Sequence, residues 1–379
     1  NAGTEMLFNT NERRFRRLLG KNGEEVVQLE ARESGTGSLT ADVTVDPGGE
    51  TVTLAIKGEG KTEVFEHVNM DPASENYLVF RIQDTAESLI TAIDLPRDPD
   101  NPLLPSLEDS TLTGGSLPSA EAFQTAVNRL EKDPTIDMVM ASVPASAGVN
   151  FIKKVYSGVL AHCDSASEAA KNRIGIGNVP AAIQSDPAEI ISMAGTFNSE
   201  RFILVAPNGV AGAVAGLIGG LDFYQSPTFK TLTGVTSLAV DYSNSTLRRL
   251  LVGNVLPVDY LEGKGFIIIK GIDTTGGQIS VTRIADRAVR RVKAISDQFI
   301  GTLNTEDGRN TLRQQIISFL TQWEKDGALV PSTDGQDPAF LVDVYSSQTD
   351  FAQGIVRVDI AVRPVRAIDY IYATILVKI

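Results

Sequence analysis

Residues 97–118 divide the chain into two parts whose sequences have different patterns. This segment, RDPDNPLLPSLEDSTLTGGSLP, contains four prolines, two adjacent glycines and four acidic residues. Proline lacks a backbone N–H donor and glycine favours turns, so regular helices and strands rarely continue through such a composition. A chain of 379 residues is also longer than one hydrophobic core usually organises. We therefore predict a linker over residues 98–118 between separately folded domains.

Before the linker, residues 1–97 are expected to form a β-rich peripheral domain. Between Thr51 and Lys57 the larger apolar residues fall on alternate positions, which is typical of a half-buried strand. Short runs rich in Val, Thr and Phe predict strands at residues 25–33, 38–46, 50–57, 62–69 and 77–83. Several short strands separated by turns favour a small β-sandwich. Because the first residue is Asn1 and not Met, this domain is expected to be truncated at its N-terminus or processed.

After the linker, residues 119–270 are expected to form a central α/β domain. Strands rich in apolar residues alternate there with amphipathic helices, which indicates a mostly parallel sheet. The predicted strands cover residues 136–141, 173–178 and 201–206. The predicted helices cover residues 119–132, with Ser119 as N-cap, 150–162 and 187–197.

Residues 271–379 have a third pattern and are expected to form a C-terminal α+β domain. Two long helices at about 282–300 and 306–326 are followed by strands at about 339–346, 352–363 and 366–379. Thr305 is a plausible N-cap for the second helix, which ends at Gly327.

The composition argues against several classes of partner. The net charge is −13, so the surface repels nucleic-acid phosphates and anionic lipids, and direct nucleic-acid binding is not expected. The longest apolar stretch, residues 210–221, has 12 residues. A bilayer span needs about 20 residues, so no membrane insertion is expected. Cys163 is the only cysteine, which excludes an internal disulfide and a zinc site built from cysteines.

The candidate catalytic and cofactor motifs are incomplete. Residues 55–62 (AIKGEGKT) nearly match a phosphate-binding loop, but Ala55 replaces the first glycine and a strand follows instead of a helix, so a hairpin turn is favoured. The sequence Gly175-Ile176-Gly177 lacks the third glycine of a dinucleotide-binding motif. His67 and His162 are the only histidines, and structural roles are favoured for both. We expect no cofactor, no metal and no catalytic residue.

Two further features have competing interpretations. Residues 210–220 (VAGAVAGLIGG) could form a glycine-rich ligand loop, but close packing of a buried helix is favoured. The helix starting near Thr282 carries a basic stripe opposite its apolar face. This stripe consists of Arg283, Arg287, Arg290, Arg291 and Lys293. A solvated face, partly neutralised by Asp286 and Asp297, and a partner-binding face are equally plausible interpretations.

The last two predicted strands differ in their patterning. Val356, Val358, Ile360 and Val362 alternate with polar residues, which predicts one wet face. In the final segment both faces are apolar, with Ile371, Ile375, Val377 and Ile379 on one and Ile368, Tyr370, Tyr372 and Leu376 on the other. An apolar strand at a chain end would promote aggregation if it were left uncovered.

The order of several segments resembles that of contractile phage tail sheath proteins, from myophages and related injection systems. The segments are residues 66–72 with 77–80, 201–208 with the following glycine- and alanine-rich helix, 266–269, 279–284, 298–301 and 362–369. The resemblance implies a central subtilisin-like α/β domain without a catalytic triad, a C-terminal α+β assembly domain and a variable β-rich outer domain. This chain departs from the family in lacking a recognisable N-terminal arm.

The resemblance also implies a structural function and not an enzymatic one. Such proteins form stacked hexameric rings around an inner tube and contract to drive it through a target envelope, with neighbours linked by exchanged terminal strands. The implied partners are other copies of the chain, the inner tail tube protein, and baseplate and tail terminator proteins. The implied location is the virion tail, assembled in the bacterial host cytoplasm.

On this basis two sets of site residues are hypothesised. Arg283, Arg287, Arg290 and Lys293 are expected to face the tube. The inter-subunit strand is expected to use Ile368, Tyr370, Ile371, Tyr372, Ile375, Leu376 and Val377. The alternatives are a hydrolase-like α/β enzyme, which needs a Ser-His-Asp constellation, and a surface-adhesion module, which only the β-rich front supports.

Overall fold

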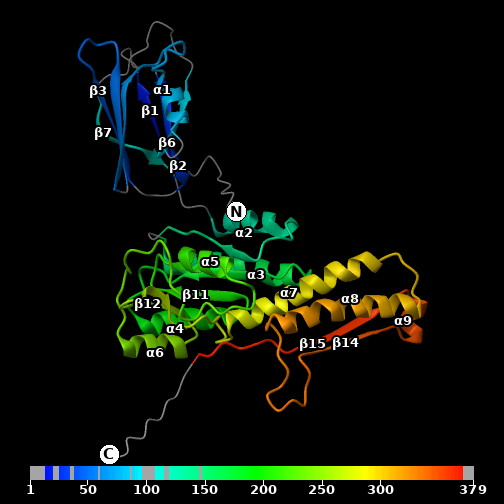
Figure 1. Cartoon of the computed structure of the whole chain (residues 1–379). Helices are drawn as coiled ribbons and strands as arrows, with labels where there is room; N and C mark the ends of the chain where they lie inside the picture. Colours follow the sequence, from blue (N-terminus) through cyan, green and yellow to red (C-terminus); the bar gives the residue numbers. More distant parts are fainter. Residues whose placement is uncertain are drawn as a thin grey trace, which may run out of the picture. The chain divides into compact units, whose positions relative to one another are not determined.

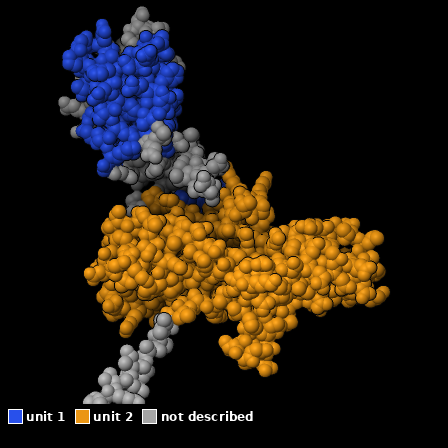
Figure 2. All heavy atoms as spheres, in the orientation of Figure 1, with its two compact units in different colours: residues 1–126 blue, residues 127–379 orange. Residues whose placement is uncertain are grey.

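The structure, a computed structural model, describes residues 13–19, 25–34, 38–58, 60–85, 88–95, 107–114, 119–144 and 147–369. The chain divides into two compact units, residues 1–126 and residues 127–379, which Figure 2 shows in blue and orange. Each unit is described by itself.

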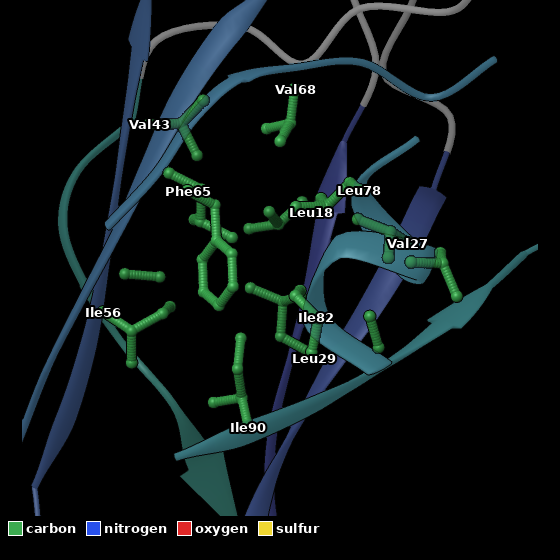
Figure 3. Packing of buried hydrophobic residues seen from close by; sticks show 14 of the residues in the cluster. Leu18, Val27, Leu29, Val43, Ile56, Phe65, Val68, Leu78, Ile82 and Ile90 are labelled. Carbon is green, nitrogen blue, oxygen red and sulfur yellow. The ribbon is translucent and has the colours of Figure 1, made fainter. Parts of the chain in front are cut away.

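Unit 1 is a sandwich of two four-stranded antiparallel sheets (Figure 1). One sheet has the order β6-β2-β1-β8, with β1 (Arg13–Leu19), β2 (Glu25–Ser34), β6 (Ile90–Asp94) and β8 (Thr113–Gly114). The other has the order β5-β4-β3-β7, with β3 (Leu39–Val45), β4 (Val52–Gly58), β5 (Lys61–Val68) and β7 (Leu107–Thr111). Alternate side chains of both sheets meet in one core, which includes Leu29 of the first sheet and Ile56 and Phe65 of the second (Figure 3).

Two predictions for unit 1 were wrong. The segment 77–83 is not a strand but helix α1 (Leu78–Gln83), because Leu78, Val79 and Ile82 share one helical face that closes the sandwich core. Residues 107–114, which were placed in the linker, form β7 and β8 and pair with β3 and β1. The sandwich therefore takes up strands from both sides of the proline-rich stretch.

The central part of unit 2 is a five-stranded sheet of order β13-β12-β11-β10-β9. The strands are β9 (Met138–Met140), β10 (Ile174–Asn178), β11 (Phe202–Ala206), β12 (Leu256–Leu261) and β13 (Gly265–Ile268). Strands β9 to β12 run parallel and β13 is antiparallel to β12. The predicted parallel sheet is therefore confirmed, and its strand order follows the chain.

Helices cover both faces of this sheet (Figure 1). One face carries α3 (Val149–Glu168), α4 (Pro187–Phe197) and α6 (Asn244–Val252), and the other carries α5 (Ala211–Gly220). Helix α2 (Ala120–Asn128) precedes the sheet and begins after Ser119, whose Oγ accepts the Ala122 N–H at 3.2 Å. Ser119 therefore has the predicted capping role.

The two glycines of β10 let α3 lie close to the sheet. A Cβ atom on Gly177 would come within 2.5 Å of the Tyr156 ring, and one on Gly175 within 2.9 Å of Val159. The Tyr156 hydroxyl accepts the Asn178 N–H at 3.0 Å and donates to the Asn178 carbonyl at 3.1 Å. Gly175 and Gly177 thus serve packing, which agrees with the rejection of a dinucleotide site.

The C-terminal part of unit 2 packs two helices against a two-stranded sheet. Its elements are α7 (Ile279–Ser296), α8 (Glu306–Lys325), β14 (Phe340–Tyr345), α9 (Gln348–Ala352) and β15 (Arg357–Val362). Helix α8 begins at Thr305, whose side chain accepts the Gly308 N–H at 3.1 Å, so this N-cap prediction is confirmed. The core between them is formed by Ile284, Ile295, Leu312, Ile316, Leu320, Leu329, Ala339 and Val342.

The last two predicted strands need correction. The segment 352–363 was expected to be one strand, but Ser347 forms a capping box with Asp350, which starts α9, so that β15 begins only at Arg357. Residues 366–369 are not in a strand, and the rest of the predicted 366–379 strand lies outside the described residues. In the described part of the chain, no helix is both long and apolar enough to span a bilayer.

The fit at Gly177 generates the first prediction. Gly177→Ala should lower the free energy of unfolding by about 1–3 kcal/mol, because the added methyl group overlaps the Tyr156 ring. Gly216→Ala is the matched control, since the added Cβ meets open space on an exposed helical face. That control should raise stability by about 0.5–1 kcal/mol. Urea unfolding measures both, and a neutral or stabilising Gly177→Ala would contradict the tight fit.

Candidate assembly surfaces

Helix α7 lies between the central sheet and the C-terminal core, and its buried side is polar as well as apolar. Ile284 and Ile295 contact the C-terminal core, whereas Ile279 joins the core of the central sheet. Asp286 is also buried, with 7% of its surface exposed. The solvated-face interpretation of this helix counted Asp286 among the residues that neutralise that face, and this part of the interpretation was wrong.

Asp286 is held by side chains of the central domain. Arg201 forms an ion pair with it, and the Asn172 side-chain amide donates to Asp286 Oδ1 at 3.0 Å. Burial raises the pKa of Asp286, while the charge and hydrogen bond of Arg201 act in the opposite direction. A buried carboxylate is costly without such partners, so Arg201 and Asn172 fix the docking of α7.

Two of the four arginines in the basic stripe are bound to their own chain. Arg283 donates to the carbonyl oxygens of Leu221 at 3.0 Å and Asp222 at 3.1 Å. Arg290 pairs with the Asp137 carboxylate and donates to the carbonyl oxygens of Ile136 and Asn172. These two side chains join α7 to the loops around the central sheet, and they are not part of a freely solvated stripe.

The remaining cations of α7 are exposed. Arg287 and Arg291 lie at the surface. Lys293 is also exposed and pairs with Asp297 one helical turn later, with Nζ 2.7 Å from Oδ2. An exposed pair of this kind contributes about 0–1 kcal/mol, so Lys293 can exchange partners at little cost. Of the four residues hypothesised to face a tube, only Arg287 and Lys293 are available for an outside partner.

The sheet of β14 and β15 has one covered face and two outer edges. Val358, Ile360 and Val362 pack against the C-terminal core while the intervening side chains are exposed, which confirms the predicted wet face. Within the described residues, β14 and β15 pair only with each other. Leu341 lies on the wet face with 61% of its surface exposed. Such edges can accept a further strand through main-chain hydrogen bonds.

The chain that leaves β15 is tied back to the central domain at its last described residues. The Gln278 side chain accepts the Ala367 N–H and donates to the Ala367 carbonyl, both at 3.0 Å. It also donates to Asp369 at 2.8 Å, and Lys270 lies 3.3 Å from the same carboxylate oxygen. Ile368, between these anchors, is 78% exposed. The sequence analysis did not single out Gln278 and Lys270. Their side chains bind a segment that is distant in sequence, and hydrophobic periodicity gives no signal for such contacts.

Of the seven residues hypothesised to form the inter-subunit strand, the structure describes only Ile368. The other six residues proposed for it, Tyr370, Ile371, Tyr372, Ile375, Leu376 and Val377, lie outside them.

The histidines occupy structural positions. Arg173, which is fully buried, donates to Nε2 of His162 at 2.6 Å, so this nitrogen accepts and His162 is neutral. Burial first, and the charge of Arg173 second, lower the pKa of His162. Burial raises the pKa of the adjacent Cys163 thiol to about 12, which makes it a poor nucleophile. His67 is exposed and pairs with the Asp46 carboxylate at 3.0 Å.

The remaining candidate motifs are also accounted for by the fold. The described residues of the segment 55–62 belong to the paired strands β4 and β5, with Gly58 opposite Lys61 at the predicted hairpin. Residues 211–220 form helix α5 and not a loop, and its buried side chains pack against the sheet, as favoured, while Gly212 and Gly216 lie on its exposed side. Among the described residues, no three His, Cys, Asp or Glu side chains gather as a metal site.

Sequence comparisons address the family of the C-terminal part. Residues 273–378 match the family model described as the phage tail sheath C-terminal domain. This part of the chain is therefore similar to sheath C-terminal domains. The tail sheath protein of Staphylococcus phage Twort is 25% identical over 162 residues. That match covers 39% of this chain and spans 27% of the relative's length.

Solved structures show that the fold extends beyond the C-terminal domain. The sheath tail protein from Desulfitobacterium hafniense is similar with a TM-score of 0.53 at 14% identity, over 89% of this chain and 77% of that one. A chain of the anti-feeding prophage helical sheath in its contracted state is similar with a TM-score of 0.52 at 15% identity, over 69% and 76%. The expected resemblance to contractile sheath proteins is confirmed, and the mixed α/β fold is that of sheath proteins.

The His162–Arg173 contact generates a prediction about pH. A histidine whose folded pKa is lowered binds its proton more readily in the unfolded chain, so stability falls as pH drops through about 6.5 towards the folded value. His162→Gln keeps an acceptor for Arg173 but cannot titrate. We expect the stability difference between wild type and variant to be constant above pH 7.5 and to shift against wild type below pH 6.5. Urea unfolding at several pH values tests this, and parallel curves would contradict a neutral buried His162.

Proposed function

We propose that this chain is a structural subunit of a contractile tail sheath. In this function copies of the chain stack as hexameric rings around an inner tube and contract to drive that tube through a target envelope. The match of residues 273–378 to the sheath C-terminal domain is the observation that carries the proposal. The likeness of both units to solved sheath proteins supports it.

The described surfaces provide a physical basis for linking copies. The β14–β15 sheet offers unpaired edges within the described residues, and the chain at Ala367 and Asp369 is anchored before it continues into residues 370–379. Those ten residues are apolar on both alternating faces. We propose that they add a strand to a neighbouring copy, with Tyr370, Ile371, Tyr372, Ile375, Leu376 and Val377 in the exchanged strand. Main-chain hydrogen bonds would supply affinity there, and alternate side chains would set the register.

The proposed tube contact involves fewer residues than the basic stripe contains. Arg283 and Arg290 are hydrogen-bonded to their own chain, so the tube-facing role falls to Arg287 and Lys293. Several weak exposed charge contacts for each ring would hold a tube before contraction and still release it.

The remaining parts of the proposal follow from the same resemblance. Baseplate and tail terminator proteins would bind the ends of the sheath, and assembly would take place in the bacterial host cytoplasm before the sheath joins the virion tail. The central domain would correspond to the subtilisin-like domain without a catalytic triad. A hydrolase function is disfavoured, because Nε2 of His162 accepts from Arg173 and the neighbouring thiol is hard to ionise.

Deleting residues 370–379 tests the exchanged strand. The cut leaves the contacts of Gln278 with Ala367 and Asp369 in place, so we expect a folded monomer that forms neither rings nor cylinders. Ile371→Ser combined with Ile375→Ser and Val377→Ser is a full-length control that removes one apolar face and should weaken assembly similarly. Thermal unfolding and negative-stain microscopy report the two properties. Normal cylinders from the deleted protein would place the linkage elsewhere.

Reversing the exposed cations tests the tube contact. Arg287→Glu with Lys293→Glu should leave the thermal unfolding of the subunit nearly unchanged, because both side chains are exposed. The same variant should assemble around the inner tube poorly, and the loss should resemble that of wild type in high salt. Co-sedimentation of sheath with purified tube measures the effect. Normal co-sedimentation would show that Arg287 and Lys293 form only a solvated face.

A further inference from the structure

The net charge of the chain is located almost entirely in unit 1. Residues 1–126 contain 22 acidic and 10 basic side chains, whereas residues 127–379 contain 25 acidic and 24 basic ones. Unit 1 therefore has a net charge of −12 and unit 2 of −1. Such a division is not required by either core, because surface charges are compatible with many sequences.

The acidic side chains of unit 1 are only partly neutralised within the unit. Three described cations of unit 1 form local ion pairs: Arg17 with Glu25, Lys57 with Asp42 and Lys61 with Glu63. Four exposed acidic residues from the end of β5 to the end of α1 have no ion pair in the structure: Glu66, Asp71, Glu75 and Asp84. In this acidic segment, residues 66–84, Arg81 is the only lysine or arginine, so the segment keeps a net negative charge.

The exposed apolar side chains follow the opposite distribution. Among the described residues, the large apolar side chains with more than 60% of their surface exposed all belong to unit 2. They are Val252, Ile300, Leu303, Leu341 and Ile368. Unit 2, which is close to neutral, therefore carries the most exposed apolar side chains. Unit 1, which carries the negative charge, has fewer exposed apolar side chains among its described residues.

We propose that the negative charge of unit 1 opposes self-association by electrostatic repulsion (the electrostatic brake). The surfaces through which copies attract one another then lie in unit 2. This inference rests on the proposed function, in which many copies lie side by side. Charges near −12 on adjacent units repel one another over distances comparable with the Debye length, which is about 10 Å at 0.1 M salt. The repulsion keeps free subunits apart and opposes packing until a partner or salt offsets it. Added salt should consequently promote association of copies, although it weakens the contact with a tube.

Two full-length variants with equal net charge test the location of the brake. The unit 1 variant combines Glu66→Gln, Asp71→Asn, Glu75→Gln and Asp84→Asn. The unit 2 variant combines Glu168→Gln, Asp241→Asn, Glu262→Gln and Glu324→Gln, all at exposed positions. Both change the net charge of the chain from −13 to −9.

Assembly is followed by light scattering and microscopy against NaCl concentration. Wild type should assemble more readily as NaCl rises, and the unit 1 variant should reach half-assembly at a NaCl concentration at least about twofold lower. The unit 2 variant should stay close to wild type. Equal shifts in both variants would mean that total charge matters and its location does not, and inhibition of wild-type assembly by NaCl would mean that attraction, not repulsion, dominates. Either result overturns the inference.

The osmotic second virial coefficient of the dilute subunit separates this inference from the proposed function. At about 0.1 M salt, where the Debye length of about 10 Å makes the location of charge matter, it should be positive for wild type and clearly smaller for the unit 1 variant than for the unit 2 variant. If no variant forms cylinders at any salt but the coefficients differ as expected, the sheath function fails and the brake stands. If the coefficients of the two variants equal each other while cylinders form, the sheath function stands and the brake fails.

Discussion

The arrangement of unit 2 depends on how a highly charged helix is accommodated between two cores. Helix α7 carries five cations and a buried aspartate, yet it contacts the central domain on one side and α8 on the other. Burial of these charges is tolerable only because each inward one has a specific partner, as Asp286 has in Arg201. Arg283 and Arg290 extend the same principle to backbone carbonyl oxygens. Removing Arg201 would leave the buried Asp286 carboxylate without its counter-charge, so this pair strongly favours one position of the helix.

This docking explains why the central and C-terminal parts form one compact unit although the sequence predicts two domains. Phe223 and Tyr224, which follow α5, pack with Trp323 of α8 in the C-terminal core. Gln278 and Lys270 then fix the chain that returns from β15. The β14–β15 sheet and the anchored chain at residues 366–369 are therefore held on a common frame.

Hydrophobic periodicity predicts most elements of unit 2 well, because the parallel strands and amphipathic helices have unambiguous periods. It fails where a short apolar run fits both periods, as in the segment that forms α1. It also cannot distinguish structural from available cations. Arg283, Arg287 and Arg290 lie near one another on the helical wheel, but the carbonyl groups that bind Arg283 and Arg290 lie more than 60 residues away in sequence. Only the tertiary fold shows which of them is free.

The distribution of interactions also suits a subunit that must change neighbours without unfolding. The contacts within unit 2 are numerous, buried and charge-assisted, so breaking them is expensive. The surfaces left for other molecules consist of exposed cations, open strand edges and scattered apolar side chains, each of which contributes little alone. In a sheath, such weak contacts are repeated in every ring, and their sum determines whether the assembly holds. We expect a lattice built this way to rearrange between rings while each subunit keeps its fold, because weak exposed contacts break more readily than the buried, charge-assisted contacts of α7.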